Sequence, residues 1–198
     1  MFIKHPYTAI FTGPTGVGKT HLVLDIIETQ YNKHFDKIII LCPTIRWNKT
    51  YIGRSWVIKD ENVWLVEPKD KLYDYIEKIS NLEAGNAVLF IVDDIIADEN
   101  LDKRRQSLLE LAISGRHKNH YLWLLTQSYT AIPKNLRRQA KAIFTWYPKE
   151  RGDMRTIHEE NDVLTNDELI VVKEHLKNVK QACLYIQNEY PRGFNLFK

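Results

Sequence analysis

Five short apolar runs alternate along the chain with longer segments in which apolar residues recur every three or four positions. Short runs of β-branched and aromatic residues are typical of buried strands, and the wider spacing is typical of helices with one apolar face. The predicted strands are Thr8–Thr12, Lys37–Cys42, Ala87–Val92, Tyr121–Thr126 and Ala142–Tyr147. Because several are apolar on both alternating faces, we expect helices on both sides of them. The alternation predicts an α/β fold around a mostly parallel, five-stranded sheet.

Helical spacing covers residues 19–31, 71–83, 101–115 and 133–141. Gly115 is suited to end the third of these helices, and Pro133 to open the fourth. After Pro148 the pattern changes: the sequence TNDE predicts a capped helix from about Asn166, and QACLYIQ predicts a last strand. We expect a single domain over residues 1–198, with its core at about 7–147 and a small α/β extension at about 148–198.

Composition narrows the class of protein only slightly. The chain has 198 residues, 44% of them hydrophobic, which is enough for one sizeable core. A net charge of +3 gives mild attraction to polyanions and excludes a histone-like binder. Cys42 and Cys183 lie far apart and lack metal-ligand spacing, so neither a disulfide framework nor a zinc site is indicated. No run approaches the roughly 20 apolar residues of a membrane span, and the N-terminus lacks a signal-peptide pattern. We therefore expect a soluble, intracellular protein.

The stretch GPTGVGKT, which begins at Gly13, fits the P-loop pattern G-x-x-x-x-G-K-[ST] and lies between a predicted strand and a predicted helix. In such a loop the backbone N–H groups surround phosphate oxygens, the lysine adds a charge, and the hydroxyl after it binds Mg²⁺. A glycine-rich turn with an incidental lysine is the alternative, and the strand and helix context disfavours it. The sequence therefore predicts a site for ATP and Mg²⁺. Its residues are Gly13, Pro14, Thr15, Gly16, Val17, Gly18, Lys19 and Thr20.

Two acids, Asp93 and Asp94, end the apolar strand AVLFIV. Magnesium prefers oxygen ligands, so Asp93 is the candidate for its second protein anchor. Asp94 is then placed to orient and deprotonate the attacking water. Asp94 could instead cap a following helix, but the position downstream of a P-loop favours the catalytic interpretation.

Gln127 ends the next apolar strand, and Arg116 lies eleven positions before it. The glutamine is a candidate for sensing the γ-phosphate or positioning water, and its alternative is an exposed strand-end residue. Arg116 is a candidate arginine finger, which stabilises the charge of the transition state. It could equally cap the dipole of the preceding helix.

Two basic segments are candidates for contact with nucleic acid. Lys134, Arg137, Arg138 and Lys141 are spaced to lie on one face of the predicted helix at residues 133–141, where solvation or an acidic neighbour is the alternative. In residues 44–59 basic and aromatic side chains alternate, although packing of a long loop explains them as well. These are Arg46, Lys49, Arg54 and Lys59, with Trp47, Tyr51 and Trp56.

Over most of residues 7–147 the chain resembles the viral genome-packaging ATPases of the FtsK/HerA superfamily, in their poxvirus-type branch. The matching pieces are TGPTGVGKT, LCPT, LFIVDDI and SGRHKNHYLWLLTQSYTAIPKNLRRQA. The resemblance implies a RecA-like P-loop NTPase, a three-layer sandwich with a five-stranded core.

The resemblance also implies roles for individual residues. Asp93 would bind Mg²⁺, Asp94 would take the base position often filled by Glu, and Gln127 would be the sensor. Arg116 would be a finger acting in trans. Arg137 matches a helix arginine of the family, whereas Gln139 stands where the family often has Asn.

As a function, the resemblance implies ATP hydrolysis coupled to translocation of double-stranded DNA into a capsid by a pentameric or hexameric ring. Capsid or portal proteins would be partners, and the protein would be virion-associated or inside the host cell, not secreted. The alternatives are a P-loop small-molecule or nucleoside kinase, an FtsK/HerA translocase outside packaging, and a nucleotide-binding scaffold without turnover.

Overall fold

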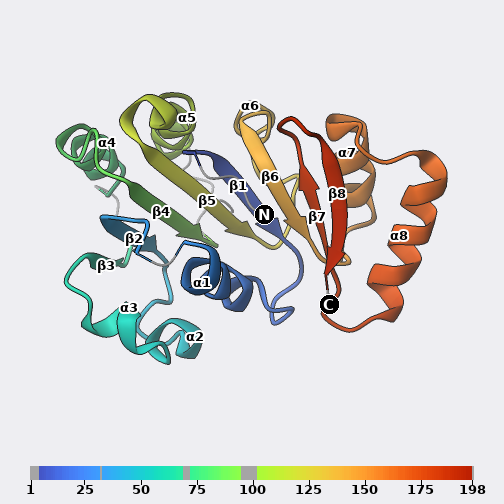
Figure 1. Ribbon diagram of the computed structural model, residues 1–198, viewed down its shortest axis with the longest axis horizontal. Helices are drawn as coiled ribbons and strands as arrows, with labels where there is room; N and C mark the ends of the chain where they lie inside the picture. Colours follow the sequence, from blue (N-terminus) through green and yellow to red (C-terminus); the bar gives the residue numbers. More distant parts are fainter. Residues whose placement is uncertain (1–4, 32, 69–71, 95–101, 198) are drawn as a thin grey trace.

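The chain folds around one eight-stranded sheet with the strand order β3-β2-β4-β5-β1-β6-β7-β8 (Figure 1). The computed structural model describes residues 5–31, 33–68, 72–94 and 102–197. The strands are β1 (Thr8–Thr12), β2 (Lys37–Leu41), β3 (Val63–Val66), β4 (Val88–Asp93), β5 (His120–Thr126), β6 (Ala140–Thr145), β7 (Cys183–Gln187) and β8 (Gly193–Phe197). The helices are α1 (Lys19–Gln30), α2 (Lys49–Ile52), α3 (Ser55–Lys59), α4 (Leu72–Leu82), α5 (Asp102–Lys118), α6 (Lys134–Arg137), α7 (Arg151–Asn161) and α8 (Asn166–Asn178).

Helices cover both faces of the sheet, as Figure 1 shows. On β4, Leu89 and Ile91 pack with residues of α1, α2 and α3, whereas Val88, Phe90 and Val92 pack with residues of α4 to α8. A strand whose two faces are both buried has no polar positions to alternate with apolar ones, which explains its continuous apolar run. The predicted three-layer α/β sandwich is thus confirmed.

The predicted number of strands is wrong: the sheet has eight strands rather than five. The five predicted strands are neighbours within it, and β3 extends one side in parallel. On the other side β7 pairs antiparallel with β6, and β8 pairs antiparallel with β7. Because the free edge of β6 exposes unpaired backbone groups, the C-terminal extension satisfies them by continuing the same sheet.

Gly115 does not end its helix, contrary to the prediction, since α5 continues to Lys118. A Cβ atom at Gly115 would lie 3.1 Å from the carbonyl oxygen of His120, the first residue of β5. The glycine therefore permits the close approach of helix and strand instead of terminating the helix. Arg116 consequently lies in the last turn of α5.

The helix predicted for residues 133–141 is also shorter than expected. It ends at Arg137, and β6 begins at Ala140, which pairs with Thr8 of β1. Pairing and the burial of the apolar side chains that follow outweigh the helical spacing of the segment. Arg138 therefore caps the helix and Lys141 lies in a strand, so the four basic residues do not form one helical face.

The predicted start of α8 is confirmed. The Thr165 hydroxyl accepts a hydrogen bond from the Glu168 backbone (3.3 Å), and the Glu168 carboxylate accepts one from the Thr165 backbone (2.8 Å). This reciprocal pair is a capping box. Among the helices that the structure describes, none is both long and apolar enough to cross a bilayer.

Candidate nucleotide site

The loop from Gly13 to Gly18 joins β1 to α1 at the carboxyl edge of the parallel strands. Gly16 (φ 81°) and Gly18 (φ 107°) have left-handed backbones, which favour glycine over residues with a Cβ atom. Gly18 is the N-cap of α1 and offers no side-chain hydrogen bond to the helix. The first N–H groups of α1 thus remain available to an anion, and the helix dipole favours one there.

Lys19 is buried within this loop. Its ammonium donates hydrogen bonds to the carbonyl oxygens of Gly13 (2.7 Å) and Pro14 (3.1 Å). Burial lowers the pKa of Lys19, and the nearby charges of Asp94 and Asp93 partly oppose that shift. The cation is therefore held inside the loop, where phosphate oxygens would compete for it.

Asp93 ends β4 and is only 5% exposed. Its carboxylate accepts hydrogen bonds from the hydroxyls of Tyr51 (2.9 Å) and Thr20 (3.5 Å). Burial raises the pKa of Asp93 to about 6, although the bond from Tyr51 lowers it. Thr20 and Asp93 thus place a hydroxyl and a carboxylate side by side, a donor set that fits Mg²⁺.

Asp94 and Gln127 meet next to this pair. The Gln127 amide donates a hydrogen bond to the Asp94 carboxylate (3.3 Å), and both side chains are exposed. Asp94 has a left-handed backbone (φ 54°), and its N–H donates to the carbonyl oxygen of Leu125 in β5 (3.1 Å). The helix that Asp94 could have capped would begin among residues 95–101, outside the described residues.

Tyr51 is a site residue that sequence reasoning placed elsewhere, among the aromatic candidates for nucleic-acid contact. It lies in α2, is fully buried, and points its hydroxyl at Asp93. Burial, together with the adjacent carboxylate, raises the pKa of this hydroxyl well above its usual value. It therefore acts as a hydrogen-bond donor to Asp93.

Asp153 of α7 organises the segment directly after Gln127, and sequence reasoning missed it as well. Its buried carboxylate accepts hydrogen bonds from the backbone N–H groups of Tyr129 (2.8 Å) and Thr130 (3.1 Å). The hydroxyls of Thr130 (2.8 Å) and Ser128 (3.2 Å) donate to it too. The C-terminal extension is thus bonded to the loop that carries the candidate sensor.

Arg116 lies away from the phosphate loop of its own chain. It is exposed in the last turn of α5, just before β5 begins, whereas the loop follows the end of the parallel neighbour β1. The length of β5, about 20 Å at 3.3 Å per residue, separates the two edges. The structure therefore does not bring Arg116 together with the other candidate site residues of its own chain.

The remaining basic candidates differ in their surroundings. Arg137 forms a two-pronged ion pair with Glu160 (2.8 and 2.7 Å) and its side chain is only 9% exposed. Lys134 and Arg138 are exposed, and Lys141 is half-buried. In the second segment, Arg54 binds Asp25 (2.6 Å) and Glu28 (2.7 Å) of α1. That arginine belongs to the packing of α2 and α3 against α1.

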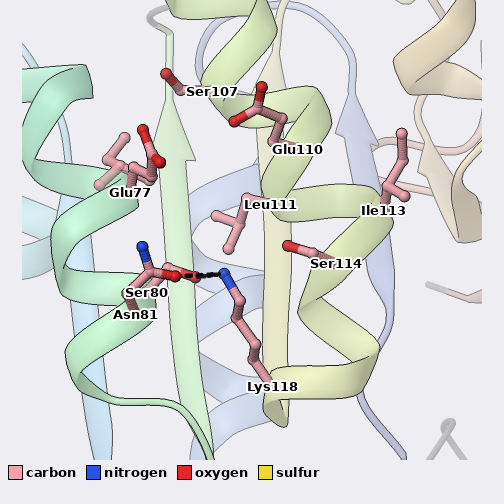
Figure 2. Close-up of a pocket in the computed structure, with 10 residues that line it drawn as sticks. Glu77, Ser80, Asn81, Ser107, Glu110, Leu111, Ile113, Ser114 and Lys118 are labelled. Atoms are coloured by element: carbon pink, nitrogen blue, oxygen red, sulfur yellow. Dashed lines mark hydrogen bonds between the residues drawn. The ribbon is translucent and has the colours of Figure 1, made fainter.

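A groove between α4 and α5, with a volume of about 290 Å³, is a separate feature (Figure 2). Glu77 and Glu110 extend from its two walls, and Lys118 donates a hydrogen bond to Asn81 across its lower end (2.9 Å). Of the candidate site residues, none lines this groove. Within the described part of the chain, no group of three or more acidic, His or Cys side chains is arranged to hold a metal.

A family model described as Poxvirus A32 protein matches residues 1–188. The chain is 30% identical over 142 residues to the DNA packaging protein OPG160 of vaccinia virus (strain Copenhagen), covering 66% of this chain and 49% of that protein. The monkeypox virus protein of the same name is also 30% identical over 142 residues, covering 66% and 44%. The chain thus spans about half the length of the curated relatives it matches.

Solved structures of viral packaging ATPases share the fold. B204, the DNA-packaging ATPase of Sulfolobus turreted icosahedral virus, matches with a TM-score of 0.73 over 99% of this chain and 98% of its own, at 18% identity. B204 of Sulfolobus turreted icosahedral virus 2, solved in complex with AMPPCP, matches with a TM-score of 0.69 over 100% and 99%, at 17% identity.

Proposed function

Because this chain belongs to the Poxvirus A32 protein family, we propose that it is an ATP-hydrolysing motor that moves double-stranded viral DNA into a capsid. The observation that carries the proposal is the convergence of three sequence elements at one edge of the sheet: the phosphate loop, the paired acids after β4, and Gln127 after β5. The packaging role of the viral relatives supports it.

ATP binds at the phosphate loop in this proposal. The backbone N–H groups of residues 15–18 and the start of α1 surround the β- and γ-phosphates, and Lys19 exchanges its carbonyl partners for phosphate oxygens. Thr20 and Asp93 are the residues that would hold Mg²⁺. When bound, the ion neutralises charge on the phosphate oxygens.

Hydrolysis then depends on Asp94 and Gln127. Gln127 orients the carboxylate of Asp94, which holds the attacking water and accepts its proton. The water oxygen forms a bond to the γ-phosphorus as the bond to the bridging oxygen breaks, giving ADP and phosphate. Arg116 of a neighbouring subunit stabilises the charge that spreads over the transferred group.

A ring of subunits would place each Arg116 beside the phosphate loop of the next subunit. DNA contacts in such a motor go to the backbone, because it must move along any sequence. Capsid or portal proteins are the expected partners, and the infected cell or the virion the expected location, as the role named for the relatives implies.

Phosphate release, measured with and without duplex DNA, tests the motor against a P-loop kinase. Stimulation by DNA supports the motor. Transfer of the γ-phosphate to a nucleoside instead of water would favour the kinase, and absence of any Mg²⁺-dependent turnover would favour a scaffold.

Asp94→Asn tests the chemical step. We expect the variant to bind ATP with unchanged affinity and to hydrolyse it about 10² to 10⁴ times more slowly, because a general base contributes that much. Asp162→Asn is the matched control, since Asp162 is also exposed and also has a left-handed backbone (φ 47°). Ordinary turnover in Asp94→Asn would remove Asp94 from the role of base.

A further inference from the structure

A small basic cavity lies near the amino ends of the parallel strands. The phosphate loop lies at their carboxyl ends. The volume of the cavity is about 160 Å³, and it is lined by Tyr129 and by residues at the end of α6, the start of β6, the end of α7 and the turn between β7 and β8. These segments meet in the upper part of Figure 1. Arg137, Arg138, Lys141 and Arg192 contribute four cations to its lining, and Glu160 contributes one anion.

The charges of the cavity are not balanced internally. Glu160 is engaged by Arg137 through two hydrogen bonds (2.8 and 2.7 Å), which neutralises that arginine. Three cations remain, on Arg138, Lys141 and Arg192. Among the described residues, no carboxylate lies within ion-pair distance of any of the three. The cavity therefore favours an anionic ligand.

The backbone holds these cations together. The N–H of Asn188 donates to the carbonyl oxygen of Lys141 (2.8 Å), and its side-chain amide donates to that of Ala140 (3.3 Å). Arg192 Nε donates in turn to the carbonyl oxygen of Asn188 (3.3 Å). The turn after β7 is thus bonded to the start of β6, which places Arg192 and Lys141 at one cavity.

We propose that this cavity binds a single backbone phosphate of duplex DNA, with Arg138, Lys141 and Arg192 as its cations. Arg137 acts as a positioning residue, because its ion pair with Glu160 joins α6 to α7 in the lining of the cavity. Guanidinium groups match the geometry of phosphate oxygens, and a volume of this size suits one anionic group rather than a nucleoside. The inference rests on the proposed function and adds the place where DNA is held. Because the phosphate loop lies at the other edge, DNA and ATP do not compete.

Binding of a labelled duplex, measured by fluorescence anisotropy over a range of salt concentrations, tests the assignment. Arg192→Gln and Lys141→Gln should each weaken binding on the order of tenfold at low salt. Each should also reduce the slope of log K against log salt by up to about 0.9, the value for complete loss of one phosphate contact. Lys177→Gln is the matched control: it removes the same charge from an exposed position on α8 and should bind like the wild type.

The outcomes separate this inference from the proposed function. If the wild type binds duplex DNA and both cavity variants keep its affinity and salt slope, the cavity is not the contact and the motor proposal stands. If the wild type does not bind duplex DNA, both fail. Arg192 is exposed in a turn, so its variant should keep the wild-type melting temperature even if Lys141→Gln does not. Sedimentation could show instead that the cavity variants no longer associate with other subunits, although the variant protein that does assemble binds DNA normally. In that case the cavity binds an acidic group of a neighbouring subunit, and the inference is overturned.

Discussion

Asp93 is a buried acid whose surroundings suit a bound cation. Its carboxylate is buried and accepts hydrogen bonds from two hydroxyls. Burial raises the pKa of Asp93 to about 6 despite those bonds. The charged form is therefore less favourable than it would be in water, although the nearby charge of Lys19 stabilises it. Tyr51 limits this cost, because its hydroxyl stabilises the ionised carboxylate.

The pKa of Asp93 makes stability depend on pH when no metal is present. The folded pKa lies above the unfolded value, so the folded state binds more protons between about pH 4 and pH 6. Stability should therefore fall as the pH rises through this window, by about 3 kcal/mol from this residue. In Tyr51→Phe the decline should extend to higher pH, since loss of the donor raises the pKa of Asp93 further.

Thermal unfolding in chelator-containing buffers from acidic to mildly basic pH measures this effect. Tyr147→Phe, a change at an exposed tyrosine, should follow the wild type. Asp93→Asn should lack the decline. A Tyr51→Phe curve parallel to that of the wild type would contradict the coupling.

The residues that sequence alone could predict are those whose position follows from a strand end. Gly13–Thr20, Asp93, Asp94 and Gln127 each come directly after a buried apolar run, and the carboxyl ends of parallel strands share one edge. Tyr51 and Asp153 have no such signal. One lies on a four-residue helix and the other on a largely polar helix, and only the tertiary structure brings them to the site.

At the scale of elements, the buried strands were predicted accurately, whereas the partly exposed strands were missed. The runs that form β1, β2, β4 and β5 are buried on both faces and were predicted to within one residue. The missed strands β3 and β8 lie at the two edges of the sheet and are partly exposed, so their sequences carry weaker patterns. Near β6, local helical spacing competed with strand pairing, and pairing with β1 prevailed.

Two glycines in helices should respond to substitution in opposite directions. Gly152→Ala in α7 should stabilise the protein by about 0.5 to 1 kcal/mol, because alanine favours the helix and a Cβ atom there meets nothing within 4 Å. Gly115→Ala in α5 should destabilise it by about 1 kcal/mol, because the Cβ atom would press on the His120 carbonyl oxygen. Urea unfolding of both variants measures the difference. A gain in both would mean that α5 can move away from β5.

At the scale of the whole molecule, the sheet separates two sets of charges. The phosphate loop and the paired acids occupy its carboxyl edge, and Arg116 and the basic cavity occupy regions near its amino edge. Arg116 and the phosphate loop of the same chain therefore lie at opposite ends of the parallel strands. If Arg116 is a finger, as proposed, it acts on the nucleotide of a second subunit.

Mixing inactive subunits tests this arrangement. Arg116→Ala should reduce turnover about 10³- to 10⁵-fold, and Lys19→Ala should abolish it. A mixture should regain part of the activity, because a Lys19→Ala subunit can lend its Arg116 to the intact loop of an Arg116→Ala neighbour. His117→Ala, a change at an exposed residue in the same turn, should retain wild-type turnover. An inert mixture of subunits that still assemble would contradict a finger acting in trans.

In the proposed function, Lys19 must give up its hydrogen bonds to the carbonyl oxygens of Gly13 and Pro14 when it binds a phosphate. Burying an ammonium without hydrogen-bond acceptors would cost free energy, and these two oxygens accept its hydrogen bonds when no phosphate does. Because these hydrogen bonds must break before Lys19 can bind a phosphate, they reduce the net contribution of Lys19 to nucleotide affinity. If turnover proceeds as proposed, the same two oxygens can bind the ammonium again after the nucleotide leaves, so Lys19 keeps a hydrogen-bond partner at every stage.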